Sequence, residues 1–101
     1  MDYFYKGSLE KGVVPRELLD LHEYFRMHGP INFEYKKEGD IIVAVSTNFR
    51  FGSIITSGRN EQELDENIKD AIMTSFDLPS SFAKEAKIYN QNKEQHDYAL
   101  A

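Results

Sequence analysis

The chain of 101 residues contains no cysteine and no tryptophan, and it has only three prolines. The lack of cysteine excludes a disulfide framework, a thiolate metal site and a thiol nucleophile. No run of eighteen apolar residues occurs, and the first residues lack the apolar stretch of a secretory signal. From these absences we expect a cytoplasmic protein that has no membrane partner.

Basic residues are also scarce, since 12 Lys and Arg stand against 17 Asp and Glu, for a formal net charge of −5. A protein that grips a phosphate backbone normally has a basic excess, so the charge favours a basic protein as partner. The acidity is concentrated in residues 61–79, which contain six acidic residues and one lysine, whereas residues 31–60 are slightly basic. That basic segment leaves RNA open as a ligand.

What the chain does contain is enough apolar material for one domain, with 41% hydrophobic residues, seven phenylalanines and six tyrosines. Glycine and proline divide it into three parts. Residues 1–30 form an N-terminal extension, residues 31–79 a core, and residues 80–101 a C-terminal segment.

The extension is predicted to hold an amphipathic helix over residues 15–28. Pro15 suits the first turn of a helix, and Gly29-Pro30 gives a stop signal. The apolar positions of this helix are expected to be Leu18, Leu19, His22 and Phe25.

The core begins with three predicted strands. Residues 31–37 alternate between apolar and polar side chains, residues 41–45 are β-formers, and residues 49–56 follow after a short loop. Gly52 predicts a bulge in the third strand. Short connections between consecutive strands indicate an antiparallel meander.

A second helix is predicted over residues 61–77, because Asn60 can cap it and Glu63 completes a capping box. Its apolar stripe is Leu64, Ile68, Ala71, Ile72, Ser75 and Phe76. Residues 80–90 are predicted to form a short helix or a strand, followed by a frayed tail. The fold class is therefore α+β: an antiparallel sheet of three or four strands packed on one main helix, with an extra N-terminal helix.

Two groups of residues are candidates for binding a partner. Glu63, Glu66 and Asp70 lie on one arc of the second helix, opposite its apolar stripe. They form either a solvated face or a surface that steers a basic partner. Phe49 and Phe51 flank Arg50, and as alternate strand residues they share a face. They are core residues, interface anchors or a platform on which RNA bases stack.

The sequence gives no sign of catalysis. His22, His28 and His96 lack the spacing of metal ligands, and we assign no metal and no cofactor. Glu34 is expected to point to solvent, which leaves too few inward carboxylates for a metal-dependent nuclease. No nucleophile motif or phosphate-binding loop occurs, so we expect no catalytic residue and no enzyme activity.

Residues 31–78 resemble the HicB-like antitoxin domain. The resemblance rests on the strand meander, on Thr56-Ser57-Gly58-Arg59-Asn60, and on a helix that carries Glu63, Asn67-Ile68 and Ala71-Ile72. In this motif Gly58 is expected at positive φ where the third strand turns into the helix, and Asn60 caps that helix. Ile68 and Ile72 are expected to pack on the sheet, and Ala71 admits close approach.

The resemblance implies a non-enzymatic antitoxin module. Such a module binds a small basic mRNA-cleaving toxin of the HicA type and neutralises it by protein–protein contact, often as a homo-oligomer. The segment after Pro79 is too short for the DNA-binding module of many family members, so direct DNA binding is not expected. The partner-binding candidates are Glu63, Glu66, Asp70, Phe49, Arg50 and Phe51. The alternatives are an RNA-binding module and an orphan HicB-like interaction protein whose partner is not a toxin.

Overall fold

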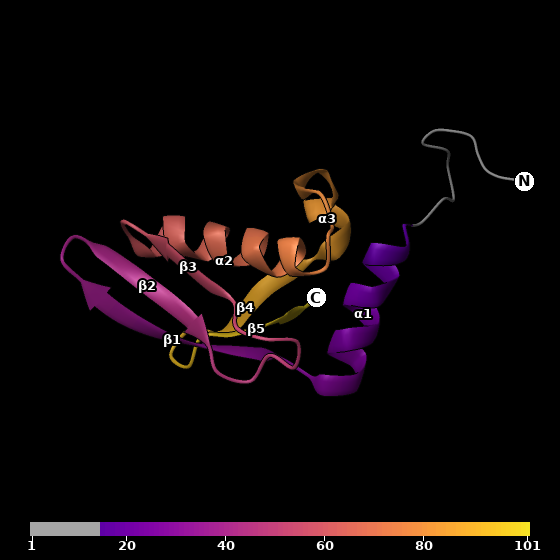
Figure 1. Cartoon of the computed structure of the whole chain (residues 1–101), viewed down its shortest axis with the longest axis horizontal. Coiled ribbons are helices and arrows are strands. Elements are labelled where there is room, and N and C mark those ends of the chain that lie inside the picture. The colour runs from indigo at the N-terminus through magenta and orange to yellow at the C-terminus, as the bar shows by residue number, and fades with distance from the viewer. Residues whose placement is uncertain (1–14) are drawn as a thin grey trace, which may run out of the picture.

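The computed structural model describes residues 15–101. The elements follow in the order α1 (Arg16–His28), β1 (Ile31–Glu38), β2 (Ile41–Ser46), β3 (Ile55–Gly58), α2 (Glu61–Ser75), a 3-10 turn η1 (Ser80–Phe82), α3 (Ala83–Ala86), β4 (Ile88–Asn92) and β5 (Asp97–Leu100). All strand pairs are antiparallel, in the order β3-β2-β1-β5-β4. The predicted α+β class is confirmed, and the sheet has five strands rather than three or four (Figure 1).

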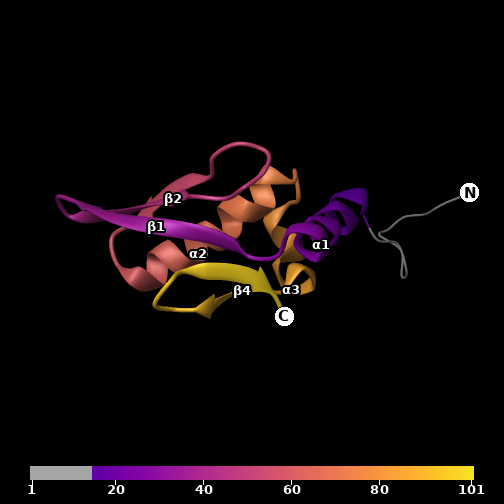
Figure 2. The same ribbon diagram turned by 90° about the horizontal axis from the view of Figure 1, so that it is seen from below.

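The sheet and α2 form two layers, with the apolar core between them. Helix α2 lies along one face of the sheet (Figure 1), and no helix of residues 15–101 covers the opposite face (Figure 2). The largest fully buried side chains are Tyr98, Phe33, Leu21, Ile31, Leu64, Ile68 and Ile72. Ile68 and Ile72 thus occupy the predicted positions, and burial of such side chains is the main force that holds α2 to the sheet.

Helix α1 stands at one end of the sheet, where it contacts α3 and β5 (Figure 1). Its end is as predicted, since Gly29 has a φ of 76° and its N–H donates to the carbonyl of Phe25. The predicted apolar stripe is partly wrong, because Leu19 and His22 are exposed. Helix α1 is oriented so that the ring of Tyr24 packs against Phe49 and Phe51, in the loop after β2, and against Phe76. We call these four rings the aromatic cluster. The buried residues are Leu18, Leu21, Tyr24 and Phe25.

The first two predicted strands are confirmed, but the third is much shorter than predicted. Residues 47–54 form a loop, and β3 starts only at Ile55. The loop is closed by Ser46, whose N–H donates to the carbonyl of Ile54 while its hydroxyl accepts the N–H of Ile54. Gly52 lies in this loop with a φ of 134°, so it is not a strand bulge. Residues 49–54 do not form the predicted strand, because the side chain of Phe49 packs into the aromatic cluster.

The C-terminal segment contains both predicted alternatives, one after the other. The short helix η1–α3 ends at Ala86, the next residue, Lys87, lies in the left-handed region, and β4 follows. The predicted frayed tail is wrong, because β4 and β5 form a hairpin and β5 pairs with β1. The side chain of Tyr98, which is fully buried, anchors β5 in the core.

Glycine is needed at position 58, between β3 and α2, but for a different reason from the predicted one. Gly58 does not have a positive φ. Instead, a Cβ atom at this position would lie 2.6 Å from the backbone nitrogen of Leu64, so only glycine lets β3 pass so close to α2. Helix α2 ends at Ser75, two residues before the predicted end, and Ser75 itself is exposed rather than part of the buried stripe. Ala71 is half-buried.

Within residues 15–101, no helix has the length and apolar character needed to cross a membrane.

Candidate partner-binding surface

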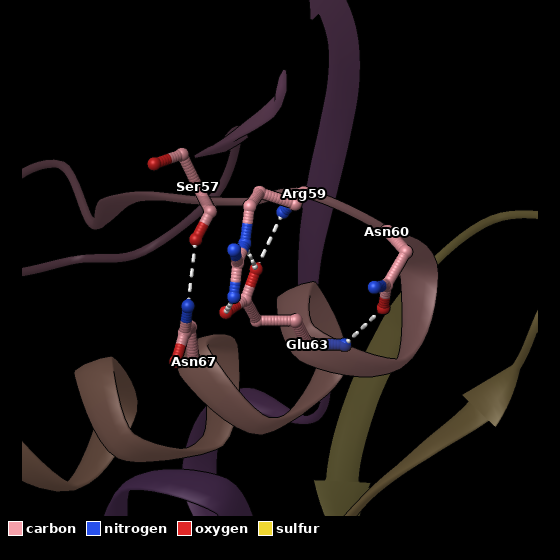
Figure 3. A network of polar contacts seen from close by, with 5 residues as sticks. All are labelled: Ser57, Arg59, Asn60, Glu63 and Asn67. Carbon is pink, nitrogen blue, oxygen red and sulfur yellow. Dashed lines mark hydrogen bonds and ion pairs between the residues drawn. The ribbon is translucent and has the colours of Figure 1, made fainter. Parts of the chain in front are cut away.

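The start of α2 is fixed by a network of polar contacts (Figure 3). The side-chain oxygen of Asn60 accepts the N–H of Glu63 at 2.8 Å, which confirms the predicted cap. The carboxylate of Glu63 accepts the main-chain N–H of Arg59 at 2.6 Å and also faces the Arg59 guanidinium at 3.3 Å. One turn further on, the side-chain amide of Asn67 donates to the carbonyl of Ser57 at 2.7 Å, which ties α2 to β3.

Because of this network, the three predicted partner-binding carboxylates Glu63, Glu66 and Asp70 have different surroundings. Hydrogen bonds from the Arg59 guanidinium and main chain hold the pKa of Glu63 below its usual value, so Glu63 is ionised and already paired. Glu66 and Asp70 are exposed and form no ion pair with any residue of the described chain. Glu63 therefore stabilises the start of α2, and Glu66 and Asp70 are the carboxylates of the three that can pair with a binding partner.

Phe49 and Phe51 lie in a loop instead of the predicted strand, but their rings still meet edge to face, with centroids 5.5 Å apart. The ring of Phe49 packs against those of Tyr24 and Phe76, at centroid distances of 5.2 and 5.9 Å. The Phe51 side chain remains 68% exposed, although its ring still touches that of Tyr24. Between them, the main-chain N–H of Arg50 donates to the hydroxyl of Tyr24 at 3.0 Å, while its side chain is exposed. Phe49 is thus half-buried against the core, and Phe51 lies at the surface.

Phe51 forms one wall of a cavity of about 410 Å³ between α1 and the C-terminal end of α2. We call this cavity the aromatic groove, after the rings and carboxylates in its lining: Tyr24, His28, Phe51, Phe76, Asp20, Glu23 and Asp77. Neither lysine nor arginine is among its lining residues. An exposed aromatic ring beside carboxylates is suited to a partner that is both basic and apolar.

The sequence interpretation missed the carboxylates of this groove. Asp20, Glu23 and Met27 follow each other at helical spacing on the side of α1 away from the core, a pattern that could have been recognised. Asp77 could not have been placed from the sequence. It has a φ of 57°, and its N–H donates to the carbonyl of Thr74, so it belongs to the turn that ends α2.

A second cluster, which we call the polar cluster, lies at the N-terminal end of α2 beside a cavity of about 510 Å³. It consists of Tyr35, Asp65, Lys69, His96 and Tyr98. The hydroxyl of Tyr98 donates to Asp65 at 2.6 Å, and the same carboxylate forms an ion pair with Lys69 at 2.9 Å. The hydroxyls of Tyr35 and Tyr98 are 3.4 Å apart, and the Tyr35 ring stacks on His96 at 3.5 Å. His96 Nδ1 is buried without a hydrogen-bond partner in the described chain.

The side chains of the polar cluster bind one another and stabilise the fold. Burial raises the pKa of both Tyr35 and Tyr98, and the carboxylate of Asp65 raises that of Tyr98 further. Both hydroxyls therefore stay protonated and act as hydrogen-bond donors, not as bases. The contact joins β5 to α2 across the core. The sequence interpretation missed it because Tyr98 falls in the segment that was expected to be frayed.

The histidines are spread over the molecule. His22 is exposed on α1, His28 lies at the aromatic groove, and His96 belongs to the polar cluster. Within residues 15–101 no three His, Asp or Glu side chains gather closely enough to hold a metal ion. Glu34 is exposed, as its place in the strand pattern predicted.

Comparisons with protein-family models, with curated proteins and with solved structures find no match for this chain. The HicB-like resemblance therefore depends only on the motif residues quoted above. What the surface binds has to be argued from its own chemistry.

Proposed function

We propose that this chain is a non-enzymatic interaction module of the HicB-like kind, which binds a small basic toxin RNase and masks its RNA-cleaving surface. The observation that carries the proposal is the exposed ring of Phe51 above the carboxylates of the aromatic groove. Aromatic side chains, phenylalanine among them, are enriched at the centre of protein interfaces. In this chain a strand meander is followed by Gly58, which packs closely on Leu64, and then by a capped helix. This order agrees with the motif on which the HicB-like resemblance rests.

The charges favour a basic protein over RNA as the ligand of this surface. Asp20 and Asp77 line the groove, and Glu66 and Asp70 add exposed carboxylates on α2. Such carboxylates raise the rate at which a basic protein associates, and they repel phosphate groups. Arg50 is the exposed cation beside Phe51, so base stacking with one phosphate contact is the alternative that the experiment must separate.

The proposal includes a homo-oligomer, since β3 and β4 are the outer strands of the sheet. Outer strands expose unpaired backbone groups that a second copy can pair with.

The test uses the product of the gene beside this chain's gene, which we expect to be a small basic protein. Cleavage of a model mRNA by that protein is measured while the chain is added in increasing amounts. We expect cleavage to stop near the stoichiometric ratio, and we expect E66K/D70K to associate at least about tenfold more slowly at low salt. The control is E34K/D40K on the β1–β2 hairpin, which changes the net charge equally and should associate at nearly the wild-type rate.

Three results would contradict the proposal. One is undiminished cleavage at excess chain. Another is an association rate that is the same in E66K/D70K and wild type at every salt concentration. The third is tight, strongly salt-dependent binding of single-stranded RNA by the chain alone, which would favour the RNA-binding alternative.

A further inference from the structure

We propose that the aromatic groove is a socket for one arginine side chain of the basic partner. The inference rests on the proposed function for the partner's identity, but the socket itself is argued from the groove's own walls. A guanidinium group is planar, stacks on aromatic rings and carries five N–H donors, so it can use a ring and carboxylates at the same time. Few other side chains match both kinds of wall.

The first wall is aromatic. The ring of Tyr24 meets those of Phe51 and Phe76 edge to face, with centroid distances of 5.3 and 5.6 Å. Phe51 and Phe76 are 6.2 Å apart at 70°. Because these edge contacts leave the Phe51 side chain 68% exposed, its ring is available to a cation from the partner.

The second wall is acidic and comes from two separate elements. Asp20 and Glu23 lie one turn apart on α1, and Asp77 follows α2. Glu23 is paired with Arg26, whereas Asp20 and Asp77 form no ion pair within residues 15–101. The two unpaired carboxylates flank the rings from two different elements. A fork of N–H donors suits this arrangement better than the single point charge of lysine.

The groove has room for an arginine side chain. Its volume of about 410 Å³ lies within the range for pockets that hold small molecules, roughly 300–1,000 Å³. The larger cavity beside the polar cluster is less suited to a cation. Of its two carboxylates, Asp65 is already bound to Tyr98 and Lys69, and Glu61 shares the wall with two lysines, Lys69 and Lys93.

The experiment titrates the full chain with a blocked arginine, acetyl-arginine-amide, and follows the backbone and aromatic NMR signals. Acetyl-lysine-amide and the neutral isostere acetyl-citrulline-amide are titrated in parallel. We expect shifts centred on Tyr24, Phe51 and Asp77, with arginine binding more tightly than lysine and with no saturable binding of citrulline. Higher salt should weaken the binding of arginine.

Two variants test the two walls. D20N/D77N removes the unpaired carboxylates and should weaken arginine binding by about fivefold. F51L keeps an apolar side chain but removes the ring, and it should weaken binding by about two- to fivefold through loss of the cation–π contact. The control E34Q, on the exposed face of β1, should bind arginine as the wild type does. The NMR spectrum of each variant reports in the same experiment whether it is folded.

The proposal is overturned if the groove signals do not move with arginine, if citrulline or lysine binds equally well, or if both variants bind like the wild type. Its failure differs from that of the proposed function. If D20N/D77N inhibits the toxin as well as the wild type does, the socket is wrong and the antitoxin function stands. If arginine binds the groove but toxin cleavage is not inhibited, the socket stands and the antitoxin function is wrong.

Discussion

At the N-terminal end of α2, the hydroxyl of Tyr98 reaches Asp65, and that carboxylate also holds Lys69. At the C-terminal end, the ring of Phe51 is largely exposed, and Asp20 and Asp77 have no ion-pair partner within residues 15–101. Both ends therefore combine aromatic rings with carboxylates. In the polar cluster these groups bind each other, whereas in the aromatic groove the ring of Phe51 and the carboxylates of Asp20 and Asp77 are exposed.

This difference separates residues that hold the fold from residues that are free to bind. Buried polar groups normally have partners inside the protein, and a satisfied contact such as that of Tyr98 stabilises the native state. An exposed ring costs free energy in water and recovers it only when a partner covers it. Substitutions at the two ends should therefore differ in what they change, with stability affected at one end and binding at the other.

The largest effect on stability is expected for Y98A. It removes a fully buried ring and its bond to Asp65, and it should lower the free energy of unfolding by about 3–5 kcal/mol, as other large aromatic truncations do. Y98F keeps the ring, and it should cost about 1.5 kcal/mol because a bond to a charged group is lost. Urea unfolding measures both. A Y98F protein as stable as the wild type would contradict the fold-holding role of the polar cluster.

The next effect is expected for G58A, at the same end of α2. The new Cβ would meet the Leu64 backbone at 2.6 Å, and relief of this clash should cost about 1–3 kcal/mol. The control is S57A, since only the main-chain carbonyl of Ser57 takes part in the contact with Asn67. Thermal unfolding compares the two. Equal melting temperatures for G58A and S57A would show that β3 and α2 can move apart without loss of stability.

How much of the fold was predictable depends on how local the contacts are. The cap of α2 was predictable because Asn60 and Glu63 act within one turn, and the hairpin of β1 and β2 because their alternation and turn are adjacent. The third strand was not, because Phe49 leaves the sheet to pack on Tyr24, a residue of another element. Strand β5 was not predictable either, since Tyr98 is fixed by distant residues.

The candidate site was predictable only in part, for the same reason. The sequence indicated Phe51 and the acidic row, but it could not show that Arg59 engages Glu63 or that Phe49 is half-buried while Phe51 is exposed. The groove itself is made by α1, a loop and the turn after α2. Periodicity describes each of these elements separately, and it does not say which side chains of different elements meet.

The smallest effect on stability is expected for F51S, and this comparison tests the groove most directly. Because Phe51 is 68% exposed, its loss should lower the free energy of unfolding by only about 0.5 kcal/mol, the low end of the range for its edge contacts with neighbouring rings. F49S, two residues away, removes a half-buried ring that packs against the core and should cost at least about 1 kcal/mol. Urea unfolding of both variants gives the comparison. If F51S were as unstable as F49S, the Phe51 ring would be part of the core, and the aromatic groove would lose the residue that marks it as a binding surface.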